Sequence, residues 1–115
     1  MASAPPDALH PRQIRTALRL SREKFARLFD VSSRTIERWE EKDCPPANAL
    51  LRRRMHELSE VAYLANAVYT PAGVELFLTS PTPVFNGRTA LQLIEDGQAE
   101  QVIGALATDY EGAFT

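Results

Sequence analysis

The chain has 115 residues, of which 44% are hydrophobic and 24% charged, a composition typical of one small globular domain or a domain with an extension. No run of about 18 apolar residues occurs, which excludes a transmembrane helix, and residues 1–7 lack the basic start and apolar stretch of a signal peptide. The single cysteine, Cys44, excludes an internal disulfide and a Cys-rich zinc site, so we expect a reducing, cytoplasmic setting.

The formal net charge of −2 combines two halves of opposite sign. Residues 10–56 contain 12 of the 13 Lys and Arg residues and six acidic residues, a net charge of +6. Residues 57–115 contain only Arg88 against eight acidic residues, a net charge of −7. This asymmetry indicates two surfaces with two different partners.

Residues 1–10 contain two prolines and several small residues, so we expect a flexible tail. Pro11 suits the first turn of a helix, because its missing N–H costs nothing there. Apolar spacing predicts that this helix runs to about Leu18 and that two more helices follow at about 22–29 and 33–40. Serines are expected to cap the second and third helices, namely Ser21 for one and Ser32 or Ser33 for the other.

Two consecutive prolines, Pro45 and Pro46, then break the chain. A long helix is predicted at about 47–68, because apolar residues recur there in steps of four and three. The inward face consists of Leu51, Met55, Leu58, Ala62, Ala65 and Tyr69, widened by Leu50, Val61, Leu64 and Val68. This face is too long for the N-terminal helices alone, so it must pack on the C-terminal helices, on a second copy of the chain, or on both.

Three shorter helices are predicted at about 72–78, 89–95 and 98–110. A Ser-Pro-Thr-Pro link and an Asn-Gly turn separate the first two, and Gly97 ends the second. No segment shows the alternation of a strand. We therefore predict an all-α fold.

The stretch from Arg22 to Trp39 has the pattern of a helix-turn-helix. Ala26 offers a small side chain where the two helices meet, and Asp30 is acceptable at a turn that needs a left-handed backbone. The second helix is anchored inward by Val31, Ile36 and Trp39 and presents Ser33, Arg34, Glu37 and Arg38 outward. Short polar side chains with arginine near the helix start are what a DNA recognition helix needs. The alternative is a helical hairpin whose arginines are simply solvated.

The stretch SREKFARLFDVSSRTIERWEE resembles the Xre-type helix-turn-helix, and the resemblance covers about residues 11–45. The small residue, the Val-Ser after the turn, the Ile and the Trp-Glu pair are in register, whereas Asp30 stands where the family prefers Gly. The resemblance implies base contacts in the major groove and a phosphate contact by Arg22. The implied DNA-binding residues are Arg22, Ser33, Arg34, Thr35, Glu37 and Arg38. For Glu37 the alternative is an ion pair with an arginine of its own helix.

The segment FLTSPTPVFNGRTALQLIEDGQAEQVIGALATDYEGAF resembles the C-terminal domain of the MbcA/ParS/Xre antitoxins. Shared marks are an apolar helix running into Ser-Pro, a Gly before Thr, a Leu-Ile-Glu-Asp-Gly helix stop and a Gly near the end, whereas Thr82 stands where relatives usually carry Asn. The resemblance implies a RES-domain toxin that degrades NAD as the partner.

The resemblance further implies that the C-terminal segment plugs the opening of the toxin's NAD site. That segment consists of Glu111, Gly112, Ala113, Phe114 and Thr115. Gly112 would let the chain bend, Phe114 would fill an apolar slot, and the carboxylates would meet cations that otherwise hold phosphate. The alternative is a frayed terminus whose Phe114 packs on its own core.

The sequence contains no arrangement of residues typical of a catalytic site. His10 and His56 lie apart, and there is no Gly-rich phosphate loop, metal-ligand spacing or nucleophile–base pair. Glu95 and Asp96 fit an ordinary helix end, and Cys44 fits an inert thiol. We therefore expect a protein that is not an enzyme and binds no cofactor and no metal.

The leading hypothesis is an antitoxin of a type II toxin–antitoxin pair that inhibits a RES-domain toxin and represses its own operator. Expected partners are the RES-domain toxin, operator DNA and a second copy of the chain in a homodimer, without a membrane. The rival is a stand-alone helix-turn-helix regulator whose C-terminal half only dimerises. The predicted divisions are a tail at 1–10, a helix-turn-helix domain at 11–46, a connecting or dimerisation helix at 47–69 and a toxin-binding domain at 70–115.

Overall fold

A computed structural model describes residues 9–113 of the chain. Its helices are α1 (Pro11–Ala17), α2 (Arg22–Phe29), α3 (Ser33–Lys42), α4 (Ala49–Val68), α5 (Pro71–Thr79), the 3-10 helix η1 (Pro83–Phe85), α6 (Ala90–Glu95) and α7 (Ala99–Ala113). Across 9–113 the only strand-like pairing is an isolated bridge between Thr82 and Arg88. The predicted all-α class is confirmed.

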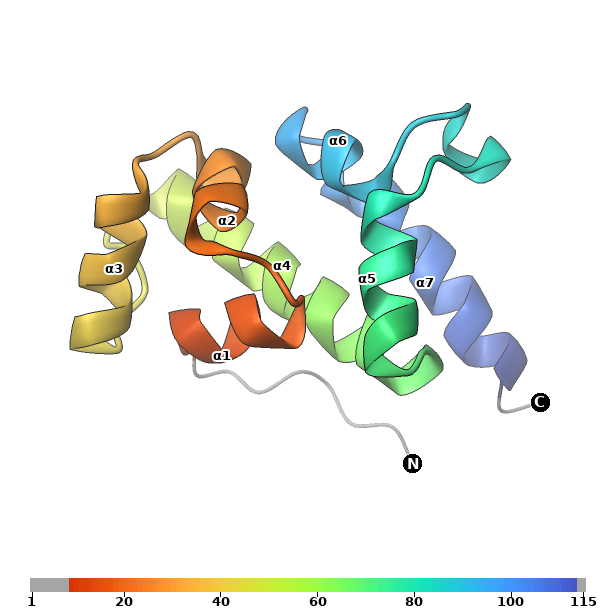
Figure 1. Ribbon diagram of the computed structural model, residues 1–115, viewed down its shortest axis with the longest axis horizontal. Helices are drawn as coiled ribbons and strands as arrows, with labels where there is room; N and C mark the ends of the chain where they lie inside the picture. Colours follow the sequence, from red (N-terminus) through yellow and green to blue (C-terminus); the bar gives the residue numbers. More distant parts are fainter. Residues whose placement is uncertain (1–8, 114–115) are drawn as a thin grey trace.

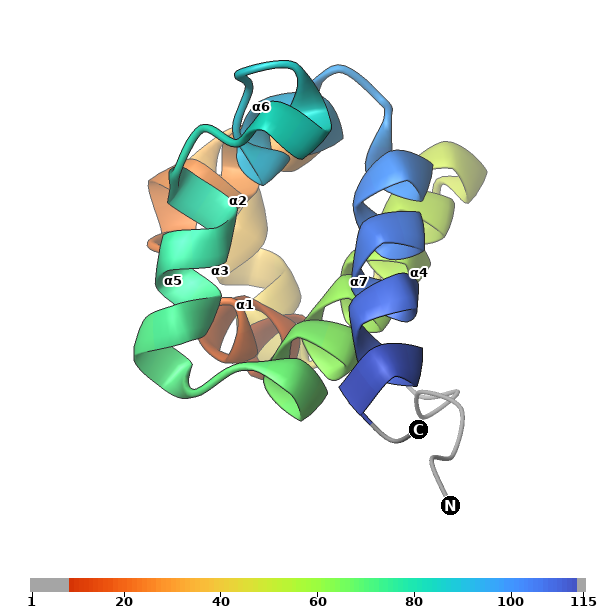
Figure 2. The ribbon, with the colours of Figure 1, turned by 90° about the vertical axis from the view of Figure 1, so that its right-hand side faces the viewer.

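Helix α4 runs through the molecule and organises the other helices around it (Figure 1). α1 packs on α4, α7 lies along α4, and α2 contacts both α3 and α6 (Figures 1 and 2). One continuous core joins these elements, from Leu18 and Phe25 in the first helices to Val102 and Leu106 in the last. The boundaries of the predicted domains stay a prediction. However, α2 of the predicted helix-turn-helix domain packs on α6 of the predicted toxin-binding domain, so the two are in direct contact.

Local capping explains where several helices begin. The backbone N–H of Lys24 donates to the Ser21 hydroxyl at 3.2 Å, and that of Thr35 donates to the Ser32 hydroxyl at 3.2 Å, so Ser32 rather than Ser33 caps α3. Asp30 takes the left-handed conformation expected of the turn, with φ of 54°. Thr89 forms a reciprocal capping box at the start of α6.

Three expectations from the sequence need correction. Leu9 was assigned to the tail but is only 5% exposed and belongs to the core, whereas residues 1–8 lie outside the described part. Leu50 is 78% exposed, because it sits about 100° around α4 from Leu51 and misses the inward face. α7 continues past the predicted end at 110 to Ala113.

Candidate nucleic-acid interface and carboxyl-terminal surface

The turn between α2 and α3 is rigidly packed. The Val31 N–H donates to the Ala26 carbonyl at 3.1 Å, and Ala26 is 3% exposed, as a small contact residue should be. The Phe29 ring meets Phe25 edge-on at 5.1 Å and Trp39 at 5.2 Å between ring centroids. α3 is therefore held on α2 by shape and aromatic contact, which gives its outer face a fixed orientation.

The outer face of α3 carries the side chains that the sequence predicted. Arg34, Glu37 and Arg38 are exposed, whereas Ser33 and Thr35 are half-buried. The Thr35 hydroxyl hydrogen-bonds the Ser32 hydroxyl at 3.1 Å and accepts from Arg38 Nη2 at 3.3 Å, so it orients Arg38. Within residues 9–113 no ion pair joins Glu37 to an arginine, which leaves the alternative reading of Glu37 without support.

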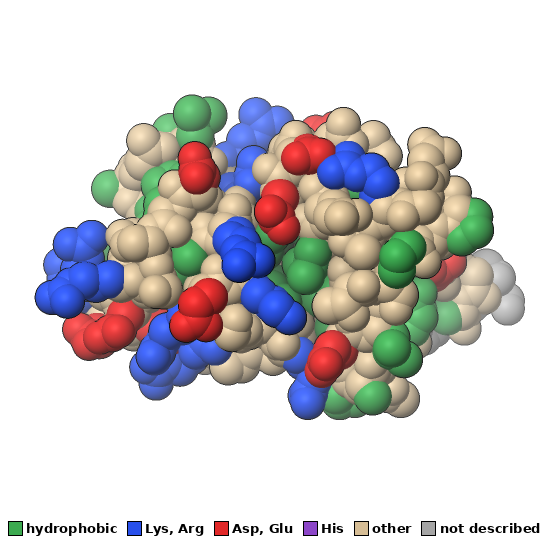
Figure 3. Space-filling model, turned by 45° about the horizontal axis from the view of Figure 1, so that its top comes forward, with side chains coloured by type: hydrophobic (Ala, Val, Ile, Leu, Met, Phe, Trp, Pro, Cys, Tyr) green, Lys and Arg blue, Asp and Glu red, His purple; other side chains and the backbone are tan. Residues whose placement is uncertain are grey.

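Positive charge concentrates on this side of the molecule. In Figure 3 most Lys and Arg side chains lie over the left-hand and central parts of the face, with acidic side chains among them. Arg52 and Arg53 are exposed near the start of α4. Arg54 turns inward instead, where it donates to the Leu28 carbonyl at the end of α2 and lies 3.6 Å from Glu57. Of the three consecutive arginines, Arg52 and Arg53 therefore lie at the surface, whereas Arg54 has a structural role.

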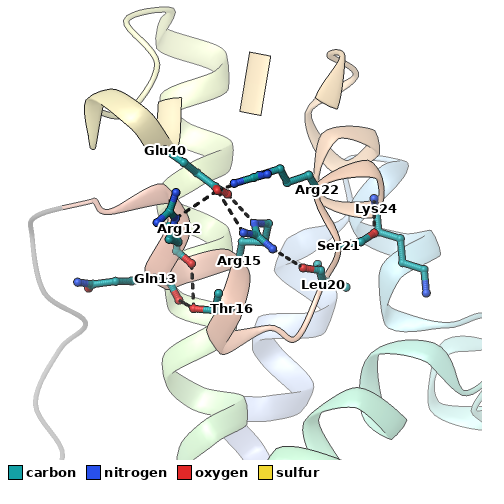
Figure 4. Close-up of polar contacts among 9 residues, drawn as sticks. All are labelled: Arg12, Gln13, Arg15, Thr16, Leu20, Ser21, Arg22, Lys24 and Glu40. Atoms are coloured by element: carbon teal, nitrogen blue, oxygen red, sulfur yellow. Dashed lines mark hydrogen bonds and ion pairs between the residues drawn. The ribbon is translucent and has the colours of Figure 1, made fainter. Parts of the chain in front are cut away.

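Arg22 pairs with a carboxylate of the chain itself. Its Nε is 3.1 Å from Oε1 of Glu40, and its side chain is still 38% exposed (Figure 4). Glu40 also accepts from Arg15 at 2.5 and 3.1 Å and from Arg12 at 3.5 Å. We call Glu40 and these three arginines the Glu40 cluster. A phosphate contact by Arg22 stays a prediction, and it competes with this structural role.

The Glu40 cluster ties α3 to α1 and α2 by a buried charge. The Glu40 side chain is fully buried. Burial on its own raises the pKa of Glu40, but the hydrogen bonds and charges of Arg15 and Arg22 outweigh it and lower the pKa below its ordinary value. The sequence contains a signal for this burial, since Glu40 follows Ile36 by four residues and lies on the same inward stripe of the helix.

The depressed pKa of Glu40 predicts a pH dependence. A carboxylate with a lowered folded pKa stabilises the fold above its unfolded pKa, and this contribution is lost as pH falls through the folded pKa. We therefore expect the free energy of unfolding to decline more steeply below about pH 5 in the natural chain than in Glu40→Gln, measured by urea unfolding. The exposed neighbour variant Glu41→Gln should keep the steep decline. Equal slopes for the natural chain and Glu40→Gln would contradict the assignment.

In the structure α7 continues through Gly112, and a bend there on toxin binding stays a prediction. Glu111, Gly112 and Ala113 form the exposed last turn of α7. One glycine costs a helix only about 1 kcal/mol, which neighbouring turns offset. Phe114 and Thr115, the other two predicted toxin-binding residues, lie outside the described residues. The part of the segment that the structure describes is therefore a helical extension at the surface.

Residues 9–113 contain no candidate metal centre and no candidate membrane-spanning helix. No group of three or more His, Cys, Asp or Glu side chains in this range is placed to hold a metal ion. None of the helices in the same range is both long and apolar enough to cross a membrane.

The helix arrangement is shared with a solved structure. It matches a chain of the M. tuberculosis MbcT–MbcA toxin–antitoxin complex with a TM-score of 0.76, over 91% of this chain and 94% of that chain. The sequence identity is 24%, so the match establishes a common fold. This fold agrees with the resemblance to MbcA-type antitoxins found in the sequence. No protein-family model and no curated protein matched the chain.

Proposed function

We propose that the protein is the antitoxin of a type II toxin–antitoxin pair. In this proposal its acidic C-terminal part binds and inhibits a RES-domain toxin that degrades NAD, and its helix-turn-helix binds operator DNA and represses its own promoter. The observation that carries the proposal is the fold shared over 91% of the chain with a component of a toxin–antitoxin complex.

The DNA-binding part of the proposal is supported by α3. Arg34 and Arg38 are exposed on the first two turns of a helix whose packing fixes its direction. Arginines in this position suit guanine edges in the major groove. The net charge of +6 over residues 10–56 supplies attraction to phosphate that does not depend on sequence. A homodimer would place two such helices on two half-sites.

The toxin-binding part is supported by the charge and position of the end of α7. Residues 57–115 have a net charge of −7, and Glu111 is exposed on the last turn of α7. Such a terminus is suited to a cationic opening, of the kind that binds the phosphates of NAD. In this proposal the exposed helical turn Glu111–Ala113 would itself face the partner.

Deletion of residues 112–115 should separate the two activities. We expect operator binding to stay unchanged and toxin inhibition to weaken about 10-fold to 100-fold, because burial of one aromatic side chain contributes about 1.5–3 kcal/mol. Operator gel shifts and growth rescue from the co-expressed toxin measure the two effects. Full growth rescue by the shortened chain would contradict the plug.

Co-expression with the adjacent reading frame tests the proposed function as a whole. If that frame encodes a RES-domain toxin, the two proteins should co-purify as a complex that survives size-exclusion chromatography. Failure to co-purify, together with retained operator binding, would favour the rival function, a regulator whose C-terminal half only dimerises.

A further inference from the structure

A groove lies between α5, η1 and α7. Its volume is about 400 Å³, and its lining includes Leu76, Phe77, Val84, Phe85, Ala105 and Asp109. Two stretches of the chain that are distant in sequence, residues 69–85 and 105–109, therefore form one largely apolar hollow. The size is sufficient for one or two large side chains of a partner.

The apolar side chains of this groove are unusually exposed. Among residues 9–113 the exposed large hydrophobic side chains are Leu50, Leu76 and Val84. Leu76 is 64% exposed and Val84 is 73% exposed, and both line the groove. A pair of exposed apolar side chains at the rim of an apolar hollow indicates an interaction site.

The walls of the groove are held in place by aromatic and polar contacts. Phe77 stacks on Tyr69 at 5.5 Å and meets Phe85 edge-on at 6.2 Å between ring centroids. The Tyr69 hydroxyl donates to Asp109 Oδ2 at 3.2 Å, which links the end of α4 to α7. Burial and the charge of Asp109 raise the pKa of Tyr69, so the hydroxyl stays a donor. The groove is therefore formed before any partner arrives, which lowers the cost of binding.

The charge around the groove favours a basic partner. Asp109 is the one charged side chain of the lining, and no Lys or Arg contributes to it. On the face shown in Figure 3, hydrophobic side chains gather along the right-hand side. A second copy of this acidic half would bring like charges together, whereas a partner with Arg or Lys beside an apolar anchor would meet Asp109 favourably.

We propose that this groove is the docking surface for the toxin and receives an apolar anchor side chain flanked by Arg or Lys. The proposal rests on the proposed function and adds a second contact region to it. Thr108 and Asp109 line the groove, and Glu111–Ala113 follow on the same helix. Docking in the groove would therefore hold α7 and its last turn, Glu111–Ala113, against the partner.

The test compares Leu76→Glu and Val84→Glu with Leu50→Glu in the full-length chain. Leu50 is a comparably exposed leucine, at 78%, on the first turn of α4, and it does not line the groove. Affinity for the purified product of the adjacent reading frame is measured by titration calorimetry. We expect each groove variant to bind at least about 10-fold more weakly and Leu50→Glu to bind within about 2-fold of the natural chain. Because the altered side chains are exposed, all three variants should melt within a few degrees of the natural chain.

Each outcome decides the proposal. If the natural chain binds and the groove variants bind as tightly as Leu50→Glu, the docking surface lies elsewhere and the proposed function stands. If the natural chain does not bind this product at all, the proposed function and the groove both fail. If a groove variant changes the mass of the free protein from dimer to monomer but binds the toxin normally, the groove joins two copies of this chain and the proposal is overturned.

Discussion

Replacement of Glu40 by alanine is expected to lower the free energy of unfolding by about 3–5 kcal/mol. The fully buried carboxylate accepts hydrogen bonds from Arg15 and Arg22, and Arg15 is itself only 16% exposed. Without Glu40, Arg15 would remain largely buried without its counter-charge, which costs more than the loss of a surface ion pair. Since a small domain has only about 5–15 kcal/mol of stability, this variant should be partly unfolded near 37 °C.

Urea unfolding followed by circular dichroism measures this effect. Glu41→Ala, at the exposed neighbouring position, is the matched control and should change stability by no more than about 0.5 kcal/mol. A loss below about 1 kcal/mol for Glu40→Ala would show that the Glu40 cluster does not hold α3 in place.

The second large effect concerns operator binding. Arg34→Ala combined with Arg38→Ala is expected to weaken binding at least about 100-fold, because each bidentate arginine–guanine contact discriminates by about 1–3 kcal/mol. Both side chains are exposed, so the variant should fold normally and should still inhibit the toxin. Gel shifts at physiological salt measure the effect, since lower salt exaggerates the attraction to phosphate.

The matched control for this variant is Arg19→Ala combined with Arg88→Ala. It also removes two positive charges, but from exposed ion pairs with Glu75 and Asp96 outside α3. If the effect were due to net charge, both double variants would bind equally weakly. Operator shifts by Arg34→Ala/Arg38→Ala that equal those of the natural chain would contradict the assignment of α3 as the recognition helix.

Features set by neighbouring residues could be predicted from the sequence. Ser21 and Thr89 cap helices because their hydroxyls reach backbone N–H groups within one turn. Asp30 takes a left-handed conformation because the turn is short and Asp tolerates it. The choice between Ser32 and Ser33 stayed open in the sequence, because either hydroxyl has a helix start within reach.

Features set by distant residues could not be predicted in the same way. Glu40 depends on Arg22, Arg15 and Arg12, which precede it by 18, 25 and 28 residues. No local pattern indicates that these side chains meet. The groove likewise depends on how α5, η1 and α7 pack, and its exposed Leu76 and Val84 read in the sequence as ordinary apolar residues.

The extent of α7 shows how packing changes a local preference. Gly112 favours a bend when it is considered alone, whereas a helix already held along α4 can extend through it at small cost. The described part of the predicted plug, Glu111–Ala113, is therefore a helical turn. Packing also explains why Leu50 is exposed. The sequence places it beside the inward face of α4, but only the packing of the other helices decides how far that face extends.

Inhibition of NAD loss tests the central claim most directly. The purified full-length chain is added in increasing amounts to the RES-domain toxin of the adjacent reading frame, and the NAD remaining is measured. The proposed function predicts that NAD loss falls to background once the chain saturates the toxin. Unchanged NAD loss at a large excess of the folded chain would contradict it.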